Sequence, residues 1–146
     1  MRNVIACAML LLAACASSPQ TPKAPEVEVH LAQVSGSRDM FFFAGPVNVE
    51  FEITVTNPTR EAVTLTRLEL RTVGGGAYTF RAPSQPMHVT VRPGLASVVR
   101  FSATAIARGG NASSVEPVTV RGMAYFDAPS GSFTRLFNET LGQLGR

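Results

Sequence analysis

Cysteine is nearly absent from this chain of 146 residues, which contains only Cys7 and Cys15. Both lie close to the N-terminus, so no disulfide can form within the rest of the chain. A disulfide-stabilised scaffold and a zinc site built from cysteines are therefore excluded, and burial of apolar side chains has to stabilise the fold. A chain of this size can bury about two thirds of its unfolded surface, which suffices for one domain without cross-links.

Histidine and the motifs of catalysis are equally scarce. His30 and His88 each stand on the polar side of an expected strand, without the neighbouring ligands that a metal site needs. The chain has no GxSxG nucleophile motif, and the Gly run at 74–76 lacks the Lys-Ser or Lys-Thr pair of a phosphate-binding loop. We therefore expect no catalytic residue, no metal and no cofactor. The chain is predicted not to be an enzyme.

No apolar run is long enough to span a membrane as a helix. Crossing a bilayer takes ~20 mostly apolar residues, and residues 4–14 provide about half of that length. The basic Arg2, the apolar residues 4–12 and the small residues Ala13 and Ala14 form the three-part pattern of a secretory signal. The N-terminal segment is thus predicted to direct export.

The residues Leu12-Ala13-Ala14-Cys15 resemble the lipobox of bacterial lipoproteins. The resemblance implies that residues 1–14 are removed, that the Cys15 sulfur carries a diacylglyceryl group and that the new amine is acylated. Each buried methylene contributes ~0.8 kcal/mol, so three acyl chains would hold the protein firmly in a membrane. Ala16 replaces the Asp that commonly retains such lipoproteins at the inner membrane, which favours the outer membrane. Ordinary secretory cleavage without lipid is the alternative.

Residues 15–25 follow as the lipidated cysteine and a tether rich in Pro and small residues. A Pro-rich segment extends by ~3.1 Å per residue, so this one would hold the domain off the bilayer. Residues 26–146 are predicted to form the folded domain, facing the periplasm.

Charge is modest and nearly balanced. The full chain has 13 Lys and Arg against 10 Asp and Glu, and removal of Arg2 leaves 12 against 10, a net charge of +2. Such a balance provides no strong field for nucleic acid, so no nucleic-acid partner is expected. The arginines on the expected strands are predicted to pair with glutamates across strands, and an anion-binding face is the alternative. Those arginines are Arg60, Arg67, Arg71, Arg81, Arg92, Arg100, Arg108, Arg121 and Arg135.

From Glu26 onward, apolar and polar residues alternate with a period of two, and no stretch has a helical period. The clearest strand covers residues 47–55 and ends at Asn57-Pro58-Thr59, because Pro has no N–H to donate to a ladder. About eight such segments predict an all-β fold, an antiparallel sandwich of the immunoglobulin or fibronectin type with seven to eight strands. The other segments are residues 27–31, 61–73, 78–80, 87–91, 98–106, 118–126 and 133–141.

Two local features refine this prediction. Val63 and Leu65 are apolar at odd positions but Leu68 and Leu70 at even ones, which predicts a β-bulge near residues 66–67. The Gly run at 74–76 predicts a tight hairpin that returns through residues 78–80. The residues expected in the core are Phe51, Ile53, Leu68, Phe101, Val120 and Phe126.

The segment VEFEITVTNPTREAVTLTRLEL, residues 49–70, resembles the strand, Asn-Pro-x turn and following strand of the WHy domain of late-embryogenesis-abundant proteins. Asn57 and Pro58 match the Asn-Pro-Asn of that family and Thr59 departs from it. The segment VTVRGMAYFDAPSGSFTRLF, residues 118–137, is similar to the closing hairpin of the domain. The resemblance implies an immunoglobulin-like sandwich without enzyme activity, a general link to stress tolerance or binding, and no catalytic residues.

The segment Met40-Phe41-Phe42-Phe43 places four apolar residues in a row between two expected strands. Neighbouring side chains of a strand point to opposite faces. If the register of the next strand extended backwards, Phe41 and Phe43 would point inward and Phe42 outward. Met40 and Phe42 are then candidate interaction residues, and a loop whose rings close the end of the sandwich is the alternative.

These observations predict a membrane-anchored lipoprotein that acts as a non-enzymatic protein-interaction module of the cell envelope. Its partners would be the membrane, through the lipid on Cys15, and a protein. The alternative is a stress-protective WHy-like domain that shields envelope proteins without a dedicated partner.

Overall fold

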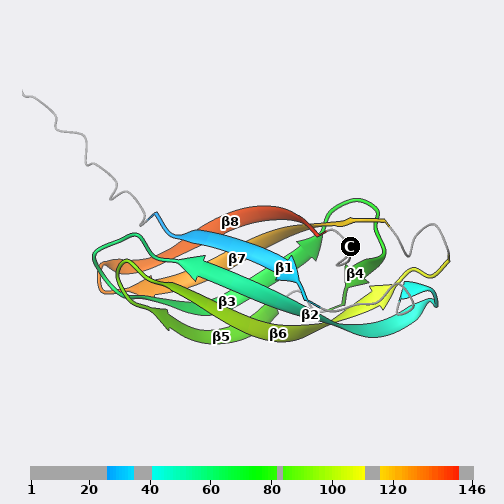
Figure 1. Cartoon of the computed structure of the whole chain (residues 1–146), viewed down its shortest axis with the longest axis horizontal. Helices are drawn as coiled ribbons and strands as arrows, with labels where there is room; N and C mark the ends of the chain where they lie inside the picture. Colours follow the sequence, from blue (N-terminus) through cyan, green and yellow to red (C-terminus); the bar gives the residue numbers. More distant parts are fainter. Residues whose placement is uncertain (1–25, 35–40, 82–83, 111–115, 142–146) are drawn as a thin grey trace, which may run out of the picture.

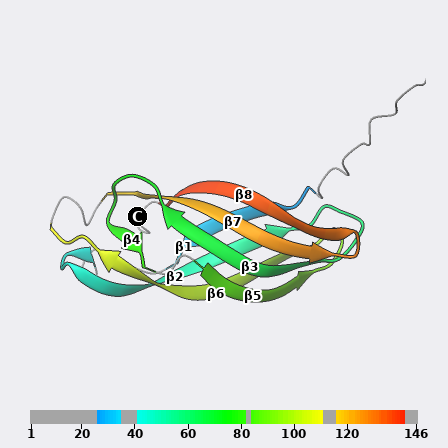
Figure 2. The same ribbon diagram turned by 180° about the vertical axis from the view of Figure 1, so that it is seen from behind.

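Two four-stranded sheets pack face to face in the computed structural model of the chain, seen from both sides in Figures 1 and 2. The structure describes residues 26–34, 41–81, 84–110 and 116–141, and none of these lies in an α-helix. Every pair of neighbouring strands is antiparallel, so the predicted all-β sandwich is confirmed. The strands are β1 (Glu28–Gln33), β2 (Gly45–Thr56), β3 (Val63–Thr72), β4 (Tyr78–Phe80), β5 (Ser84–Val91), β6 (Ala96–Ala107), β7 (Val118–Ala128) and β8 (Gly131–Leu141).

The strand order is that of an immunoglobulin-like sandwich. Sheet A has the order β1-β2-β6-β4 and sheet B the order β5-β3-β7-β8. In immunoglobulin constant domains the strands ABED form one sheet and CFG the other. Here β1, β2 and β6 take the places of A, B and E, whereas β3, β7 and β8 take those of C, F and G. The short β4 lies beside β6 where D would lie, and β5 extends sheet B beside β3.

The core lies between the two sheets and follows the predicted alternation. Along β2 the odd residues from Val49 to Val55 are buried and the even residues face outward. Of the six predicted core residues, five are at most 1% exposed, namely Phe51, Ile53, Leu68, Val120 and Phe126.

Phe101 is the exception, because it is only half-buried against the core. On one side β6 pairs with β2 along its whole length, but on the other side β4 pairs only with its last residues, 105–107. The ring of Phe101 therefore lies at an edge of sheet A, where it stacks on Phe51 with 5.6 Å between ring centroids.

The predicted β-bulge is present in β3. Leu65 is opposite Phe126 and Arg67 is opposite Tyr125, so the register shifts between Leu65 and Arg67. The extra residue, Thr66, donates its hydroxyl hydrogen bond to the Tyr125 carbonyl at 3.2 Å. As a result, the apolar residues on both sides of the bulge face the same core.

The hairpin predicted at residues 74–76 is wrong. β3 belongs to sheet B, whereas β4 pairs with β6 in sheet A, so the chain crosses from one sheet to the other at this point. Gly74 and Gly76 have positive φ values of 78° and 129°, which permit this crossing. Alternation assigns a residue to the core side of a strand, but it does not tell which sheet the strand joins.

Asn57 ends β2 and is completely buried. Its side-chain amide donates to the carbonyls of Glu61 at 2.8 Å and Val91 at 3.0 Å. Its side-chain oxygen accepts from the backbone N–H and the hydroxyl of Thr59, at 3.1 and 2.7 Å. One side chain thus joins the end of β2, the approach to β3 and the end of β5.

Candidate interaction site

Most of the predicted site residues lie outside the described residues. These are the lipobox residues Leu12, Ala13 and Ala14, the lipidation residue Cys15 and the interaction residue Met40. No helix within the described ranges is long and apolar enough to cross a membrane. Phe42 is the predicted site residue that the structure places.

Phe41 closes the end of the core. It is 1% exposed, and its ring stacks on Tyr78 with 5.2 Å between centroids. The Tyr78 hydroxyl donates to the side-chain oxygen of Gln33 at 2.9 Å. Burial raises the pKa of Tyr78 far above its ordinary value, so the phenol remains a neutral donor at physiological pH. Phe41 thus points inward, but from a turn and not from a strand, so its ring follows the stated alternative of a loop that closes the end of the sandwich.

Phe42 faces outward, as predicted, and is 47% exposed, but the inward orientation predicted for Phe43 is wrong. Phe43 is 74% exposed, and its ring meets that of Phe42 edge-to-face with 5.2 Å between centroids. Residues 41–44 form a turn, and β2 begins only at Gly45, so the strand register does not extend backwards. We call Phe42 and Phe43 the aromatic tip.

Neighbouring loops hold the aromatic tip in place. The Gly110 N–H donates to the Phe42 carbonyl at 2.9 Å. At Gly109, with φ of 73°, a Cβ atom would lie 2.7 Å from the Ala44 nitrogen, so only glycine permits this approach. Arg108 donates its guanidinium to the Gly74 carbonyl at 3.4 Å, which joins the same loop to the crossing after β3. The two exposed rings are therefore presented on a backbone fixed from several directions.

The aromatic tip lies at the end of the sandwich opposite the start of β1 (Figure 1). Glu28 at the start of β1 is opposite Thr56 at the end of β2, whereas the tip immediately precedes Gly45 at the beginning of β2. β2 has twelve residues, and the eleven steps between them, at ~3.4 Å each, separate the two ends by roughly 37 Å.

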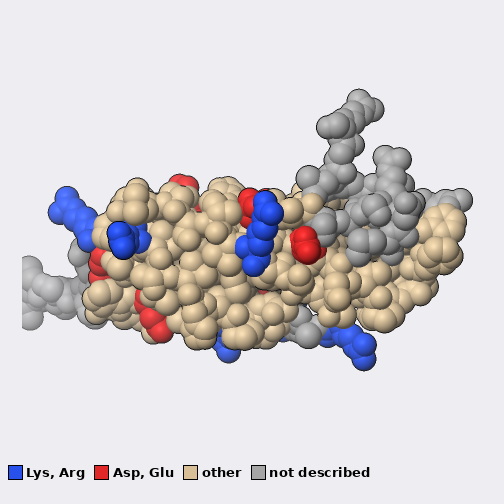
Figure 3. Space-filling view, turned by 60° about the horizontal axis from the view of Figure 1, so that its bottom comes forward, with Lys and Arg blue, Asp and Glu red and all other residues tan. Residues whose placement is uncertain are grey.

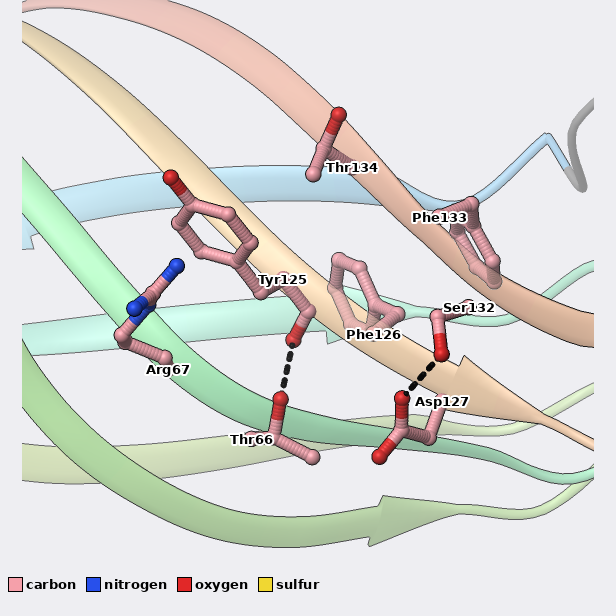
Figure 4. A pocket seen from close by; sticks show the side chains of 8 residues that line it. All are labelled: Thr66, Arg67, Tyr125, Phe126, Asp127, Ser132, Phe133 and Thr134. Carbon is pink, nitrogen blue, oxygen red and sulfur yellow. Dashed lines mark hydrogen bonds between the residues drawn. The ribbon is translucent and has the colours of Figure 1, made fainter.

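The outer face of sheet B carries a second set of side chains that sequence reasoning did not group. The Arg67 guanidinium lies over the Tyr125 ring, 3.8 Å from its centroid, and its Nε is 3.6 Å from the Glu69 carboxylate. Figure 4 shows Arg67 and Tyr125 at the rim of a hollow of about 370 Å³ beside the β-bulge. The Ser132 hydroxyl donates to Asp127 at 2.7 Å at the other side of this hollow.

A second hollow, of about 280 Å³, lies farther along the same face. It is lined by Glu69, Arg71, Arg121, Gly122, Met123 and Leu136. Arg71 and Arg121 are directly opposite each other on β3 and β7, and Leu136 is 67% exposed. We call Arg71, Arg121, Met123 and Leu136 the arginine face.

The histidines are exposed, as predicted. His30 on β1 is within 3.2 Å of the Glu139 carboxylate on β8, across the edge where the two sheets meet. His88 faces solvent on β5. No group of three or more His, Cys, Asp or Glu side chains suited to a metal ion occurs among the residues that the structure describes.

Cross-strand charge pairing is present at some of the predicted positions. The Arg100 guanidinium donates to the Glu52 carboxylate at 3.1 Å on the outer face of sheet A. In Figure 3 the charged groups of both signs are scattered over a largely uncharged face.

No family model matches the chain, and no curated protein matches it. Among solved structures it is similar to Northeast Structural Genomics Consortium target SoR45, with a TM-score of 0.51 and 16% identity over 82% of this chain and 86% of that chain. It is also similar to the putative ApaA protein of Bordetella pertussis, with a TM-score of 0.44 and 13% identity over 80% and 90% of the two chains. A FixG-related protein of Vibrio parahaemolyticus is similar with a TM-score of 0.41 and 15% identity, over 80% of this chain and 95% of that chain. The likeness to SoR45 supports the β-sandwich fold alone.

Proposed function

We propose that this protein is an outer-membrane lipoprotein, anchored through Cys15, whose β-sandwich is a non-enzymatic protein-interaction module facing the periplasm. The single observation that carries the interaction role is the exposed aromatic tip. Large apolar side chains that are exposed side by side are typical of contact surfaces.

The position of the tip supports a protein partner over the bilayer. The lipobox and tether precede Glu26, and β1 begins at the end of the sandwich opposite Phe42 and Phe43. An anchor on Cys15 would place the start of β1 nearest to the membrane and direct the tip away from it.

The aromatic tip is tested by Phe43→Asp in the full-length protein in its native envelope. Phe43 is 74% exposed, so the charge remains solvated and the melting temperature should change by less than about 2 °C. An aromatic anchor at the centre of an interface contributes about 2 kcal/mol or more, so crosslinking to the partner should fall at least about tenfold.

Leu95→Asp is the matched control. Leu95 is also an exposed apolar residue, at 53%, but it lies in the turn before β6, at the other end of the sandwich. This variant should retain the crosslink. Equal loss in both variants, or an unchanged crosslink in Phe43→Asp, would contradict the role of the tip. Many weak crosslinks without one stoichiometric partner would instead favour the WHy-like protective role.

The anchor is tested by Cys15→Ser. Without the thiol no diacylglyceryl group can be attached, so incorporation of labelled palmitate should be lost and the lipid-dependent cleavage before residue 15 should not occur. Palmitate labelling and fractionation of the envelope measure both effects. A variant that is still labelled and still fractionates with the outer membrane would disprove the lipobox assignment, and Cys7→Ser, expected to behave as wild type, is the control.

A further inference from the structure

The outer face of sheet B brings two like charges together without compensation. Arg71 and Arg121 occupy directly opposite positions on β3 and β7, and both are exposed on the outer face. Side chains at such positions have their Cβ atoms about 5 Å apart, and like charges there are destabilising. Cross-strand pairs normally stabilise a sheet, so this pair costs folding free energy.

No carboxylate among the described residues lies within ion-pair distance of Arg71 or Arg121. The Nε of Arg121 donates to the side-chain oxygen of Asn138 at 3.2 Å, which is a neutral acceptor. Glu69, the acid in the same hollow, is within 3.6 Å of Arg67, and Asp127, farther along the face, accepts from Ser132. The three arginines on this face therefore outnumber the two acids, and the excess positive charge lies at the Arg71–Arg121 pair.

Apolar side chains border the two arginines. Met123 is opposite both Glu69 on β3 and Leu136 on β8, so this row lies next to the row of Arg71, Arg121 and Asn138. Leu136 is 67% exposed, although neighbouring strand positions facing outward are mostly polar. The arginine face thus offers paired guanidinium donors and an apolar surface within one hollow of about 280 Å³.

We propose that the arginine face binds an acidic segment of a partner protein. A carboxylate of the segment accepts hydrogen bonds from Arg71 and Arg121, and an adjacent apolar side chain packs on Met123 and Leu136. Guanidinium groups match carboxylates in geometry and charge.

The shape of the hollow favours a protein segment over a small anion. An exposed ion pair alone contributes little, because water and salt screen it. A ligand at this open face therefore needs apolar contact as well as charge, and a hollow of about 280 Å³ on a sheet is too shallow to enclose an amphiphilic small molecule. An extended peptide with an acidic and an apolar residue two positions apart presents both on one face, at the spacing of the two rows.

The inference rests on the proposed function only in taking the partner to be a protein. It concerns a surface separate from the aromatic tip and is tested with the purified chain. Peptide binding can fail while crosslinking through Phe43 succeeds, and the reverse can also occur, so the two proposals are distinguished.

The experiment measures fluorescence anisotropy of rhodamine-labelled peptides with the purified full-length protein in neutral detergent at low salt. The peptide SESLS, whose Glu and Leu share one face when extended, should bind at least about tenfold more tightly than SQSLS, because only the former presents a carboxylate. Arg71→Gln and Arg121→Gln should each weaken binding of SESLS about fivefold or more, and Leu136→Ser should weaken binding of both peptides.

Arg100→Gln is the matched control, because Arg100 lies on sheet A and pairs with Glu52. It should leave binding unchanged within about twofold. Arg71→Glu distinguishes binding from a structural role: it creates an opposite-charge pair with Arg121, so the melting temperature should be maintained or raised while SESLS binding is lost.

Three results would overturn the proposal. The first is equal binding of SESLS and SQSLS. The second is a loss in Arg100→Gln as large as that in Arg71→Gln. The third is binding of phosphatidylglycerol vesicles that depends on Arg71 and Arg121 while SESLS does not bind, since this would identify a lipid surface as the ligand.

Discussion

Replacement of Asn57 by alanine is expected to lower the free energy of unfolding by about 4 kcal/mol. The side chain is completely buried, and its four hydrogen bonds reach Thr59, Glu61 and Val91. Alanine would remove this donor from the Val91 carbonyl and this acceptor from the Thr59 N–H, and each buried polar group left unpaired costs about 1–3 kcal/mol. The Glu61 carbonyl keeps the Thr59 hydroxyl as a donor at 3.0 Å. Urea unfolding of the variant, with an unchanged m value, measures the loss.

Two further variants separate the contributions of the Asn57 amide and the Thr59 hydroxyl to the free energy of unfolding. Asn57→Asp keeps the shape but replaces the amide donor with an acceptor, so it should destabilise the protein at least as much as alanine at neutral pH. Thr59→Val keeps the shape of the side chain but removes its hydroxyl, and about 1 kcal/mol should be lost. That hydroxyl lies 2.7 Å from the Asn57 side-chain oxygen, 3.0 Å from the Glu61 carbonyl oxygen and 3.4 Å from the Glu61 nitrogen. A loss below about 1 kcal/mol in Asn57→Ala would show that water replaces the amide.

The hydrogen bonds of the Asn57 side chain explain why an Asn-Pro pair follows the end of β2. Proline stops the ladder because it lacks a donor, a property that can be predicted from sequence. The role of asparagine cannot be predicted locally, since one of its acceptors, Val91, is 34 residues away. The Asn57-Pro58 pair, one of the features behind the resemblance to the WHy domain, thus forms a structural joint of the sandwich.

The strands could be predicted from the sequence because apolar and polar residues alternate along each of them, and the apolar residues mark the buried side. Even the bulge in β3 was predictable, since Val63 and Leu65 have one parity and Leu68 and Leu70 the other, and all four face the core. The crossing at residues 74–76 was not predictable, because a hairpin and a crossing between sheets both need glycine. Which sheet β4 joins depends on contacts with β6, far along the chain.

The candidate sites were less predictable than the fold for a related reason. Phe43 was assigned to the wrong side because the turn of residues 41–44 breaks the register that alternation assumes. Arg71 and Arg121 are 50 positions apart, and only the pairing of β3 with β7 brings them together. The sequence raised an anion-binding face as an alternative, but could not select these two arginines from the nine on or near the strands.

Phe51 and Phe101 allow the cost of removing a ring to be compared at two levels of burial, because they are directly opposite each other on β2 and β6 but differ in exposure. Phe51 is 0% exposed, and its ring centroid lies 5.6 Å from those of Phe80 and Phe101 and 6.4 Å from that of Tyr78. Phe51→Ala should therefore cost about 3–5 kcal/mol, through the lost transfer free energy and the cavity left among these rings.

Phe101→Ala removes the same atoms from the facing position and is the matched control. Phe101 is only half-buried at the edge of sheet A, and a site open to solvent leaves a smaller closed cavity. Its loss should be about 1–2 kcal/mol. Urea unfolding of both variants measures the difference. Equal losses would show that the edge beside β6 is closed in solution, and a loss below about 1 kcal/mol in Phe51→Ala would contradict the assignment of this face of β2 to the core.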